Sequence, residues 1–432
     1  SNSTPGSSGS TSTPPGPAVD ISDISIPDES SWIPEGTITI AEDQNNATLT
    51  AAIVDYMALH PNVKINVVQT AGGKTTLEQL KTMLAGGSAA DIVNMDSCYI
   101  TTAGAANQLF DLTAFGANDI KGLFTASCWN AVSSSTGDQV FGLPFDANTI
   151  CLLYNVDLFN AAGVTNPPST FAEMKTAASS LLAKYPNFAP YTFPFDWPVA
   201  NWKAFMYFTW LWRCGGEILT SDYKQAAFNS TVGVEALQMI VDLKKDKLTT
   251  ANYQHDQFFR GEVGMIDIGS WTYESTFESG LTSHFGASLM PELKAGVPRY
   301  SGLGLYSYCL PNKITKNMTD EERAVALNTA RVAYDFIQFL CTSQTYQLQY
   351  CKENHFITSL ISGQSDPFYD NGAWPVYVEQ LPLAKTRPGV NDWNRIEEYI
   401  SDAITLAVSE QRTVKEALDS AATYTNKRLS RD

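Results

Sequence analysis

Aromatic rings and carboxylates are the residues of this chain best suited to chemistry. Trp, Tyr and Phe make up 11% of its 432 residues, and they gather densely in residues 191–212. Sugars present apolar C–H faces and a rim of hydroxyls, so a sugar site needs flat aromatic platforms beside polar groups in the ring plane. Trp197 and Trp202, in the proline-broken part of this segment, are therefore candidate platforms, although each also suits a core. Helical spacing predicts that Phe205, Phe208, Trp210 and Trp212 pack in a core.

Signatures of catalysis are missing from the sequence. It contains no His-Glu-x-x-His, Gly-x-Ser-x-Gly or Gly-x-x-x-x-Gly-Lys motif, and its four histidines lack metal-ligand spacing. A glycoside hydrolase needs two carboxyl groups across the scissile bond, but 45 acidic residues guarantee many such pairs by chance. We therefore predict no enzymatic activity, no cofactor and no metal, with a glycoside hydrolase as a weaker alternative.

Composition narrows the class of protein further. A net charge of −17 argues against nucleic acid as a partner, because phosphate binding requires a basic surface. No apolar run approaches the ~20 residues that span a bilayer. The seven cysteines form no Cys-x-x-Cys pair, and most are expected to be buried and unpaired. The sequence is compatible with a disulfide between Cys341 and Cys351 and also with two free thiols.

The N-terminal stretch differs from the rest of the chain. Residues 1–20 consist almost entirely of Ser, Thr, Gly and Pro, a composition that cannot bury a core. We expect residues 1–35 to form a disordered tether, of which Ser1-Asn-Ser is typical of a vector-derived start. The remaining length predicts two domains.

Several short motifs follow one another along the chain. Gly142-Leu-Pro-Phe-Asp146 leads into Leu153-Tyr-Asn-Val-Asp-Leu-Phe159, and Pro167-Pro-Ser-Thr-Phe-Ala-Glu173 follows. Ala90-Asp-Ile-Val-Asn-Met-Asp-Ser97 precedes this block, and Phe258-Phe-Arg-Gly-Glu-Val-Gly-Met-Ile-Asp-Ile-Gly-Ser-Trp271 comes after it. In this order the motifs resemble the family 1 extracellular solute-binding proteins, the sugar-capturing subunits of ABC importers. The resemblance extends from about residue 37 to residue 428.

The resemblance implies an α/β, two-lobed periplasmic-binding-protein fold of type II-like topology. Each lobe would be a mixed sheet flanked by helices, and several chain crossings would form the hinge. We expect residues 36–147 and 303–362 in the N-terminal lobe, and residues 148–302 and 363–432 in the C-terminal lobe. Alternating strands and helices up to about residue 143 agree with this architecture. Capping boxes are predicted at Thr170 with Glu173 and at Thr319 with Glu322.

Positions that the family uses for ligand contact extend the set of candidate residues. Asp96 and Ser97 end a strand, where open α/β sheets place their ligands. Asp43 is either a ligand carboxylate or an ordinary loop or capping residue, and Arg387 either reaches the cleft or forms a surface salt bridge. Together with Trp197 and Trp202, the predicted site contains Asp43, Asp96, Ser97, Asp146, Asn148, Trp271, Tyr273, Tyr306, Arg387 and Trp393. Trp393 has a second interpretation, in which it fastens its helix to the lobe.

The function implied by the resemblance is capture of a carbohydrate, a di- or oligosaccharide, between closing lobes and delivery to ABC permease subunits. A glycan sensor or adhesin-like surface protein is the alternative. The expected location is the bacterial cell surface, with a lipid anchor preceding Ser1 as the only membrane attachment, and the protein is expected to be a monomer.

Overall fold

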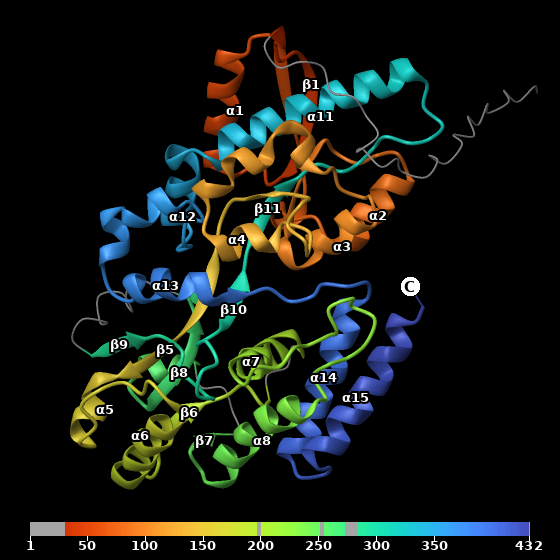
Figure 1. The fold of residues 1–432 in the computed structure, drawn as a ribbon. Helices are drawn as coiled ribbons and strands as arrows, with labels where there is room; N and C mark the ends of the chain where they lie inside the picture. The colour runs from red at the N-terminus through yellow and green to blue at the C-terminus, as the bar shows by residue number, and fades with distance from the viewer. Residues whose placement is uncertain (1–30, 197–199, 251–254, 273–283, 432) are drawn as a thin grey trace, which may run out of the picture.

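The computed structural model describes residues 31–196, 200–250, 255–272 and 284–431, and two mixed sheets organise them (Figure 1). The first sheet has the order β2-β1-β3-β11-β4. Its parallel part is β2, β1 and β3, and β11 returns antiparallel to β3 and β4. The strands are β1 (Gly36–Glu42), β2 (Val63–Gln69), β3 (Ile92–Asp96), β4 (Leu143–Pro144) and β11 (Tyr306–Cys309).

The second sheet has seven strands among the described residues, in the order β12-β10-β5-β8-β6-β7, and β9 also pairs with β5. Its centre, β5 with β8, is buried along nearly its whole length, as expected for a sheet covered on both faces. The strands are β5 (Asn148–Asn155), β6 (Ala189–Thr192), β7 (Thr249–Thr250), β8 (Val263–Gly269), β9 (Phe285–Ser288), β10 (Ser301–Gly304) and β12 (Ala384–Lys385).

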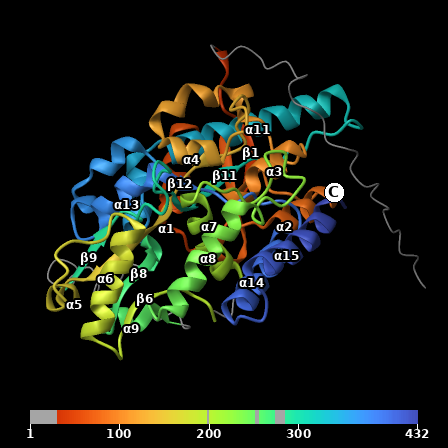
Figure 2. The ribbon, with the colours of Figure 1, turned by 60° about the horizontal axis from the view of Figure 1, so that its bottom comes forward.

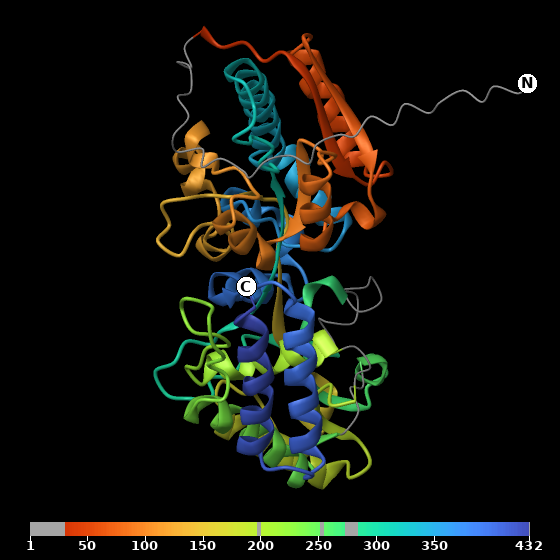
Figure 3. The ribbon, with the colours of Figure 1, turned by 90° about the vertical axis from the view of Figure 1, so that its right-hand side faces the viewer.

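Helices cover both sheets and complete two lobes, which lie one above the other in Figure 3. The helices of the first lobe are α1 (Ala47–Leu59), α2 (Leu77–Ala85), α3 (Ile100–Ala105), α4 (Ala126–Ala131), α11 (Asp320–Cys341) and α12 (Gln349–Glu353). Those of the second lobe are α5 (Val156–Ala161), α6 (Phe171–Lys184), α7 (Ala200–Arg213), α8 (Thr231–Lys245), α9 (His255–Phe259), α13 (Trp374–Gln380), α14 (Trp393–Val408) and α15 (Val414–Leu429). In Figure 2, α6, α8, α14 and α15 cover the side of the second lobe that comes forward. The predicted α/β class with helix-flanked mixed sheets is confirmed.

Adjacent strands carry the chain from one sheet to the other. Residues 145–147 join β4 to β5, and Leu305 alone separates β10 from β11. A further passage runs between Leu360 in the first lobe and α13 in the second. Because β4 pairs with β11 while β5 pairs with β10, two of these passages lie side by side. Residues at both of them are therefore brought close together.

The predicted helix signals hold in part. Thr319 and Glu322 form the expected capping box on α11, and Val332, Phe336 and Leu340 of that helix are buried. The helical spacing of these residues in the sequence predicts that Val325 also faces inward, but it is 67% exposed. Near the start of α11 this position turns outward, and no element of the described residues covers it.

The capping box predicted at Thr170 forms only by half. Thr170 accepts a hydrogen bond from the Glu173 amide, but the Glu173 carboxylate accepts from Ser169 instead of returning to Thr170. All seven cysteines are buried and unpaired, so the disulfide left open between Cys341 and Cys351 does not form. Among the described residues, no helix combines the length and apolarity that a bilayer crossing demands.

Gln347 connects the segments that meet where the chain leaves the first lobe. Its side chain is completely buried, and Nε2 donates to the carbonyl oxygens of Pro144 (3.2 Å) and Cys341 (2.7 Å). Its Oε1 accepts from the Leu360 amide (3.2 Å) and from the hydroxyls of Thr358 and Ser359. The side-chain amide of Gln347 therefore forms hydrogen bonds with β4, with the end of α11 and with residues 358–360.

Replacing Gln347 by leucine should lower the free energy of unfolding by about 2–4 kcal/mol, because buried polar groups would lose their partners. Gln349→Leu is the matched control, since Gln349 is exposed and bonds only to Glu353 on the next turn; it should change stability by less than about 0.5 kcal/mol. Urea unfolding followed by circular dichroism measures both. Equal effects of the two substitutions would contradict the role assigned to Gln347.

Candidate functional site

Glu42 ends β1 as a buried carboxylate with three hydrogen bonds. Its oxygens accept from Asn94 Nδ2 (3.1 Å), Tyr308 Oη (2.7 Å) and the Asp43 amide (3.0 Å), and the residue is 3% exposed. Gly73 approaches it so closely that an added Cβ would lie 1.7 Å from Glu42 Oε1, and its φ of +71° also favours glycine. Sequence reasoning missed Glu42, although its position at the end of a strand was the available signal.

Asp43, the next residue, is half-buried and accepts a hydrogen bond from the Asn45 amide (2.9 Å). This contact makes it a turn carboxylate, one of the two roles expected for it, and its ligand role stays a prediction. Ser97 lies deeper than expected. It is 1% exposed, and its hydroxyl is 2.9 Å from that of Ser307 on β11. The structure therefore places Ser97 inside the first lobe, where it joins two strands instead of facing a ligand.

Asp146 and Tyr306 meet where the adjacent passages leave the first sheet. The Tyr306 amide donates to Asp146 Oδ1 (3.1 Å), whereas Oδ2 has no hydrogen-bond partner in the part of the chain that the structure describes. Burial raises the pKa of Asp146 to about 6, and the Lys74 ammonium opposes this rise. Lys74 Nζ lies 4.2 Å from the centre of the Tyr306 ring. The junction thus holds a carboxylate that is costly to ionise beside an aromatic ring.

Asn148 opens β5 on the side of the second lobe. It is 6% exposed, it lies opposite Gly304 of β10, and its Oδ1 accepts from the Ser270 hydroxyl (3.2 Å). Ser270 precedes Trp271 just beyond the end of β8. The structure therefore brings Asn148 into the neighbourhood of the predicted tryptophan platform, two residues after Asp146.

Trp271 is 38% exposed, an unusual degree for the largest side chain. Its ring meets that of Trp202 edge to face, with centroids 5.6 Å apart and planes at 83°. Gly269 lies beneath it, because a Cβ there would come within 2.2 Å of the indole. Trp202 was expected in an irregular segment but lies on α7, where it is half-buried. Trp197 and Tyr273 fall outside the described residues.

Arg387 joins the two lobes through carboxylates. Its guanidinium donates to Asp96 Oδ2 at the end of β3 (2.8 Å) and to Glu397 Oε1 on α14 (3.3 Å). Its side chain is only 15% exposed and lies over the Phe205 ring, 5.2 Å from the centroid. The adjoining Gly389 amide donates to the Cys98 carbonyl (2.9 Å). Arg387 is therefore mostly buried and paired with one carboxylate from each lobe, so it forms an interlobe contact and not a surface salt bridge.

Trp393 does not belong with the candidate site. It is completely buried in the core of the second lobe, where its ring centre lies 6.0 Å from that of Phe208. This is the packing role considered for it, since the apolar face of α14 turns it inward. The position observed for Trp393 is the packing one, and its ligand contact stays a prediction. On α7, Phe205, Phe208, Trp210 and Trp212 are buried, which confirms their core assignment.

No group of three or more potential metal ligands occurs among the described residues. What remains at the junction is a carboxylate edge on the first lobe and an aromatic corner on the second. The buried carboxylates of Glu42 and Asp146 and the half-buried Tyr306 belong to the former, and Trp202 and Trp271 form the latter. Such a combination can hold a ring with polar edges and apolar faces, since carboxylates accept hydroxyl hydrogens and indole rings stack.

The raised pKa of Asp146 predicts a pH-dependent stability. An acid whose pKa rises on folding destabilises the folded state as the pH rises from its unfolded value, near 4, to its folded value, near 6. The full penalty, about 3 kcal/mol, is present above pH 6 and absent below pH 4. In the unaltered protein the free energy of unfolding, measured in urea, should therefore fall as the pH rises from 4 to 7. Asp146→Asn should remove this fall. Parallel pH profiles of the two proteins would refute it.

The Asp96–Arg387 contact predicts a bias between lobe arrangements. Asp96→Asn should weaken it by about 1.5–3 kcal/mol, the usual size for a hydrogen bond to a charged group, and so favour separation of the lobes tenfold or more. Small-angle scattering of the ligand-free variant should give a larger radius of gyration than the unaltered protein. Glu398→Gln, which breaks an exposed pair with Arg395, is the control and should change nothing. An unchanged radius for Asp96→Asn would show that the pair has no influence on the lobes.

Comparisons with known proteins agree with this geometry. The model of the bacterial extracellular solute-binding protein family matches residues 41–344. A putative binding protein of Brucella abortus is 21% identical over 358 residues, covering 81% of this chain and 82% of the relative. Among solved structures, the cyclic alpha-maltosyl-1,6-maltose binding protein from Arthrobacter globiformis has 22% identity and a TM-score of 0.75, covering 92% of this chain and all of its own.

The sugar-binding protein MalE from Xanthomonas citri has 15% identity and a TM-score of 0.75, covering 92% of this chain and 98% of its own. These structural likenesses confirm the two-lobed periplasmic-binding-protein fold. The matched family consists of binding proteins, not of enzymes, and its members act outside the cell. Because the family model spans more than half of the sequence, this chain belongs to the bacterial extracellular solute-binding proteins.

Proposed function

We propose that this protein captures a carbohydrate, a neutral di- or oligosaccharide, between its lobes and delivers it to the permease subunits of an ABC importer. The observation that carries the proposal is the exposed Trp271 ring, braced edge to face by Trp202. A large aromatic surface left in water at the lobe junction suits stacking on the C–H face of a sugar. A structurally similar protein adds support, because the ABC substrate-binding protein Lmo0181 from Listeria monocytogenes was solved in complex with cycloalternan.

Each remaining candidate residue has a part in this proposal. Asp146 is completely buried, so its Oδ2, which lacks a partner among the described residues, would accept a hydroxyl hydrogen only once lobe movement exposes it, and Tyr306 would border the same sugar. Asn148 would supply an amide from the second lobe. Asp43 would take part through the carboxylate oxygen that its turn does not use. Trp197 and Tyr273, outside the described residues, stay candidates from sequence alone.

The charges at the junction favour a neutral ligand over an anionic one. Glu42, Asp96 and Asp146 gather on the first lobe, and like charges would repel a uronic or phosphorylated sugar. The nearby guanidinium of Arg387 is already engaged by Asp96 and Glu397. An anionic ligand would have to displace one of these carboxylates before it reached that cation.

Lobe closure would couple capture to delivery. Polar groups of both lobes are satisfied together only when the lobes enclose the ligand, so binding shifts the population toward the closed arrangement. The observed affinity is then the contact energy less the cost of that shift. The permease would recognise the closed form. Attachment through a lipid anchor before Ser1 and a monomeric state remain predictions that accompany this function.

A ligand screen tests the proposal directly. The unfolding temperature is measured against a panel of neutral oligosaccharides, monosaccharides, uronic acids, amino acids and peptides, and a neutral oligosaccharide should raise it most. Hits are then incubated with the protein and examined for new reducing ends, which should not appear. Stabilisation only by amino acids or peptides would overturn the carbohydrate proposal, and cleavage of a glycan would favour a hydrolase.

Trp271→Ala should weaken binding of the glycan found in that screen by about 1 kcal/mol or more, roughly fivefold, because the stacking surface is lost. Tyr424→Ala is the matched control: Tyr424 is 56% exposed on α15, and its ring contacts that of Tyr399, away from the lobe junction. Isothermal titration calorimetry measures both affinities. If the two variants bind as tightly as the unaltered protein, Trp271 is not a sugar platform.

A further inference from the structure

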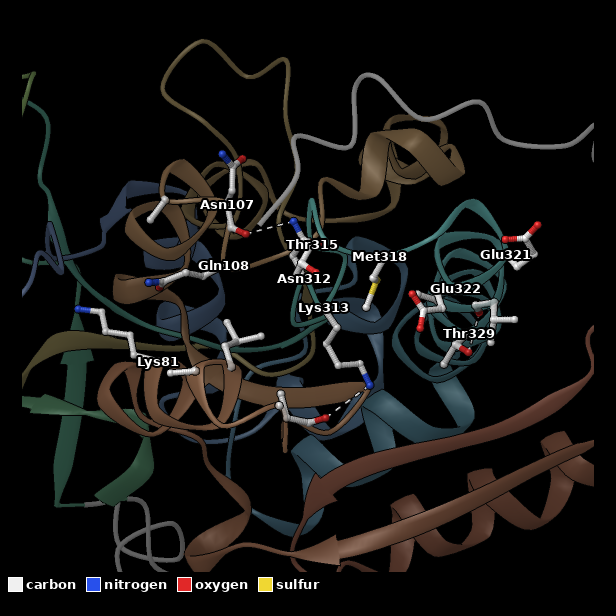
Figure 4. A pocket seen from close by; sticks show the side chains of 17 residues that line it. Lys81, Asn107, Gln108, Asn312, Lys313, Thr315, Met318, Glu321, Glu322 and Thr329 are labelled. Atoms are coloured by element: carbon white, nitrogen blue, oxygen red, sulfur yellow. Dashed lines mark hydrogen bonds between the residues drawn. The ribbon is translucent and has the colours of Figure 1, made fainter. Parts of the chain in front are cut away.

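Lysines of the first lobe differ in whether their ammonium groups are already engaged. A groove of about 800 Å³ on this lobe, which none of the candidate site residues lines, contains two of them (Figure 4). Lys313 donates to the Ala89 carbonyl oxygen (3.4 Å) and contacts the Asp91 carboxylate. Lys81, on α2, contacts the side chain of Asn391. Both ammonium groups therefore have partners within the protein.

Lys74 differs from them, because its ammonium forms no hydrogen bond and no ion pair within the described ranges. It is half-buried, and its Nζ lies 4.2 Å from the centre of the Tyr306 ring. An aromatic ring attracts a cation through its electron-rich face, but it offers the N–H groups no lone pair. Since an ammonium carries three donors, Lys74 retains hydrogen-bonding capacity for a further partner.

The backbone on either side of Lys74 is fixed at the end of the first sheet. Gly72 and Gly73 both have left-handed φ angles (+64° and +71°), and Gly73 packs directly against the Glu42 carboxylate at the end of β1. On the other side, the Thr75 amide donates to a backbone carbonyl of β3 (2.8 Å). The loop therefore holds the lysine beside the strand ends that carry the carboxylates of the candidate site.

Those carboxylates satisfy only one half of a sugar hydroxyl. Glu42, Asp96 and Asp146 accept hydrogen bonds when ionised but cannot donate them, whereas a hydroxyl oxygen also needs a donor. An oxygen enclosed in a site without a donor costs free energy, because it has lost its water. The guanidinium of Arg387 is already engaged by carboxylates of both lobes. Lys74 is therefore the cation at this junction whose donors remain for the oxygens of a ligand.

We propose that Lys74 binds the captured glycan directly, donating hydrogen bonds from Nζ to hydroxyl oxygens of the sugar that borders Tyr306. This inference rests on the proposed capture of a glycan. One cation beside Glu42, Asp96 and Asp146 leaves no excess of positive charge, so a neutral ligand stays favoured. A site built to hydrogen-bond a hydroxyl discriminates against an analogue that lacks it, and Lys74 thereby selects glycans hydroxylated at that position.

Deoxy analogues of the glycan test this contact. The probes are the neutral oligosaccharide that most stabilises the unaltered protein in the ligand screen and the set of its monodeoxy analogues. Lys74→Met removes the donors but keeps an unbranched side chain, and it should weaken binding of the parent glycan about tenfold or more in calorimetry. With one monodeoxy analogue the substitution should have little further effect, because the partner of Lys74 is already missing.

Lys64→Met is the matched control, since Lys64 is an exposed lysine on β2 of the same lobe, and it should leave the affinity unchanged. A Lys74→Met variant that binds as tightly as the unaltered protein, or that loses the same factor with every analogue, would overturn the role of Lys74 and leave glycan capture standing. If no neutral oligosaccharide binds the unaltered protein, both proposals fail.

Amine labelling of the unaltered protein supplies a second measurement that needs no substitution. An N-hydroxysuccinimide ester of acetic acid modifies accessible lysines, and peptide mass spectrometry gives the rate at each position. The same neutral oligosaccharide at saturation should slow modification of Lys74 several-fold and leave that of Lys64 unchanged. Equal rates at Lys74 with and without the oligosaccharide would contradict a direct contact.

Discussion

The site depends on one constraint: the two sheets are joined by two neighbouring antiparallel passages of the chain. The hydrogen bond from the Tyr306 amide to Asp146 connects these two passages. Asp146 lies between β4 and β5, and Tyr306 opens β11 directly after Leu305. Each strand ends in one sheet and continues in the other, so side chains near the break belong to both lobes. Movement of the lobes must therefore bend the chain here, as well as at the passage between Leu360 and α13.

Burial at that junction determines its chemistry. A carboxylate removed from water is costly to ionise, which explains the raised pKa of Asp146. Glu42, equally buried, has its oxygens occupied by Asn94, Tyr308 and a backbone amide. Glu42 is therefore a structural carboxylate, whereas Asp146 keeps one oxygen without a hydrogen-bond partner among the described residues. Gln347 stabilises the junction by donating a hydrogen bond to the Pro144 carbonyl oxygen.

The interlobe contacts of Arg387 differ from the surface salt bridge that was one of its two expected roles. With Asp96 on one side and Glu397 on the other, its charge is balanced inside the protein. The proposed preference for a neutral sugar and the predicted tendency of the lobes to stay together would both depend on these three side chains. Specificity and closure would be linked through one ion-pair network.

The sequence by itself determined the α/β class, the positions of most strands and helices, and the two-lobed arrangement implied by its motifs. These features follow from local patterns, such as the capping box at Thr319 or the buried run of β5. Only the tertiary structure decided that Trp393 is core, that Ser97 is internal, that Val325 is exposed and that Arg387 bridges the lobes. Burial and pairing of such side chains depend on neighbours far along the chain, and Arg387 and Asp96 are 291 residues apart. Periodicity within a single segment carries no information about that meeting.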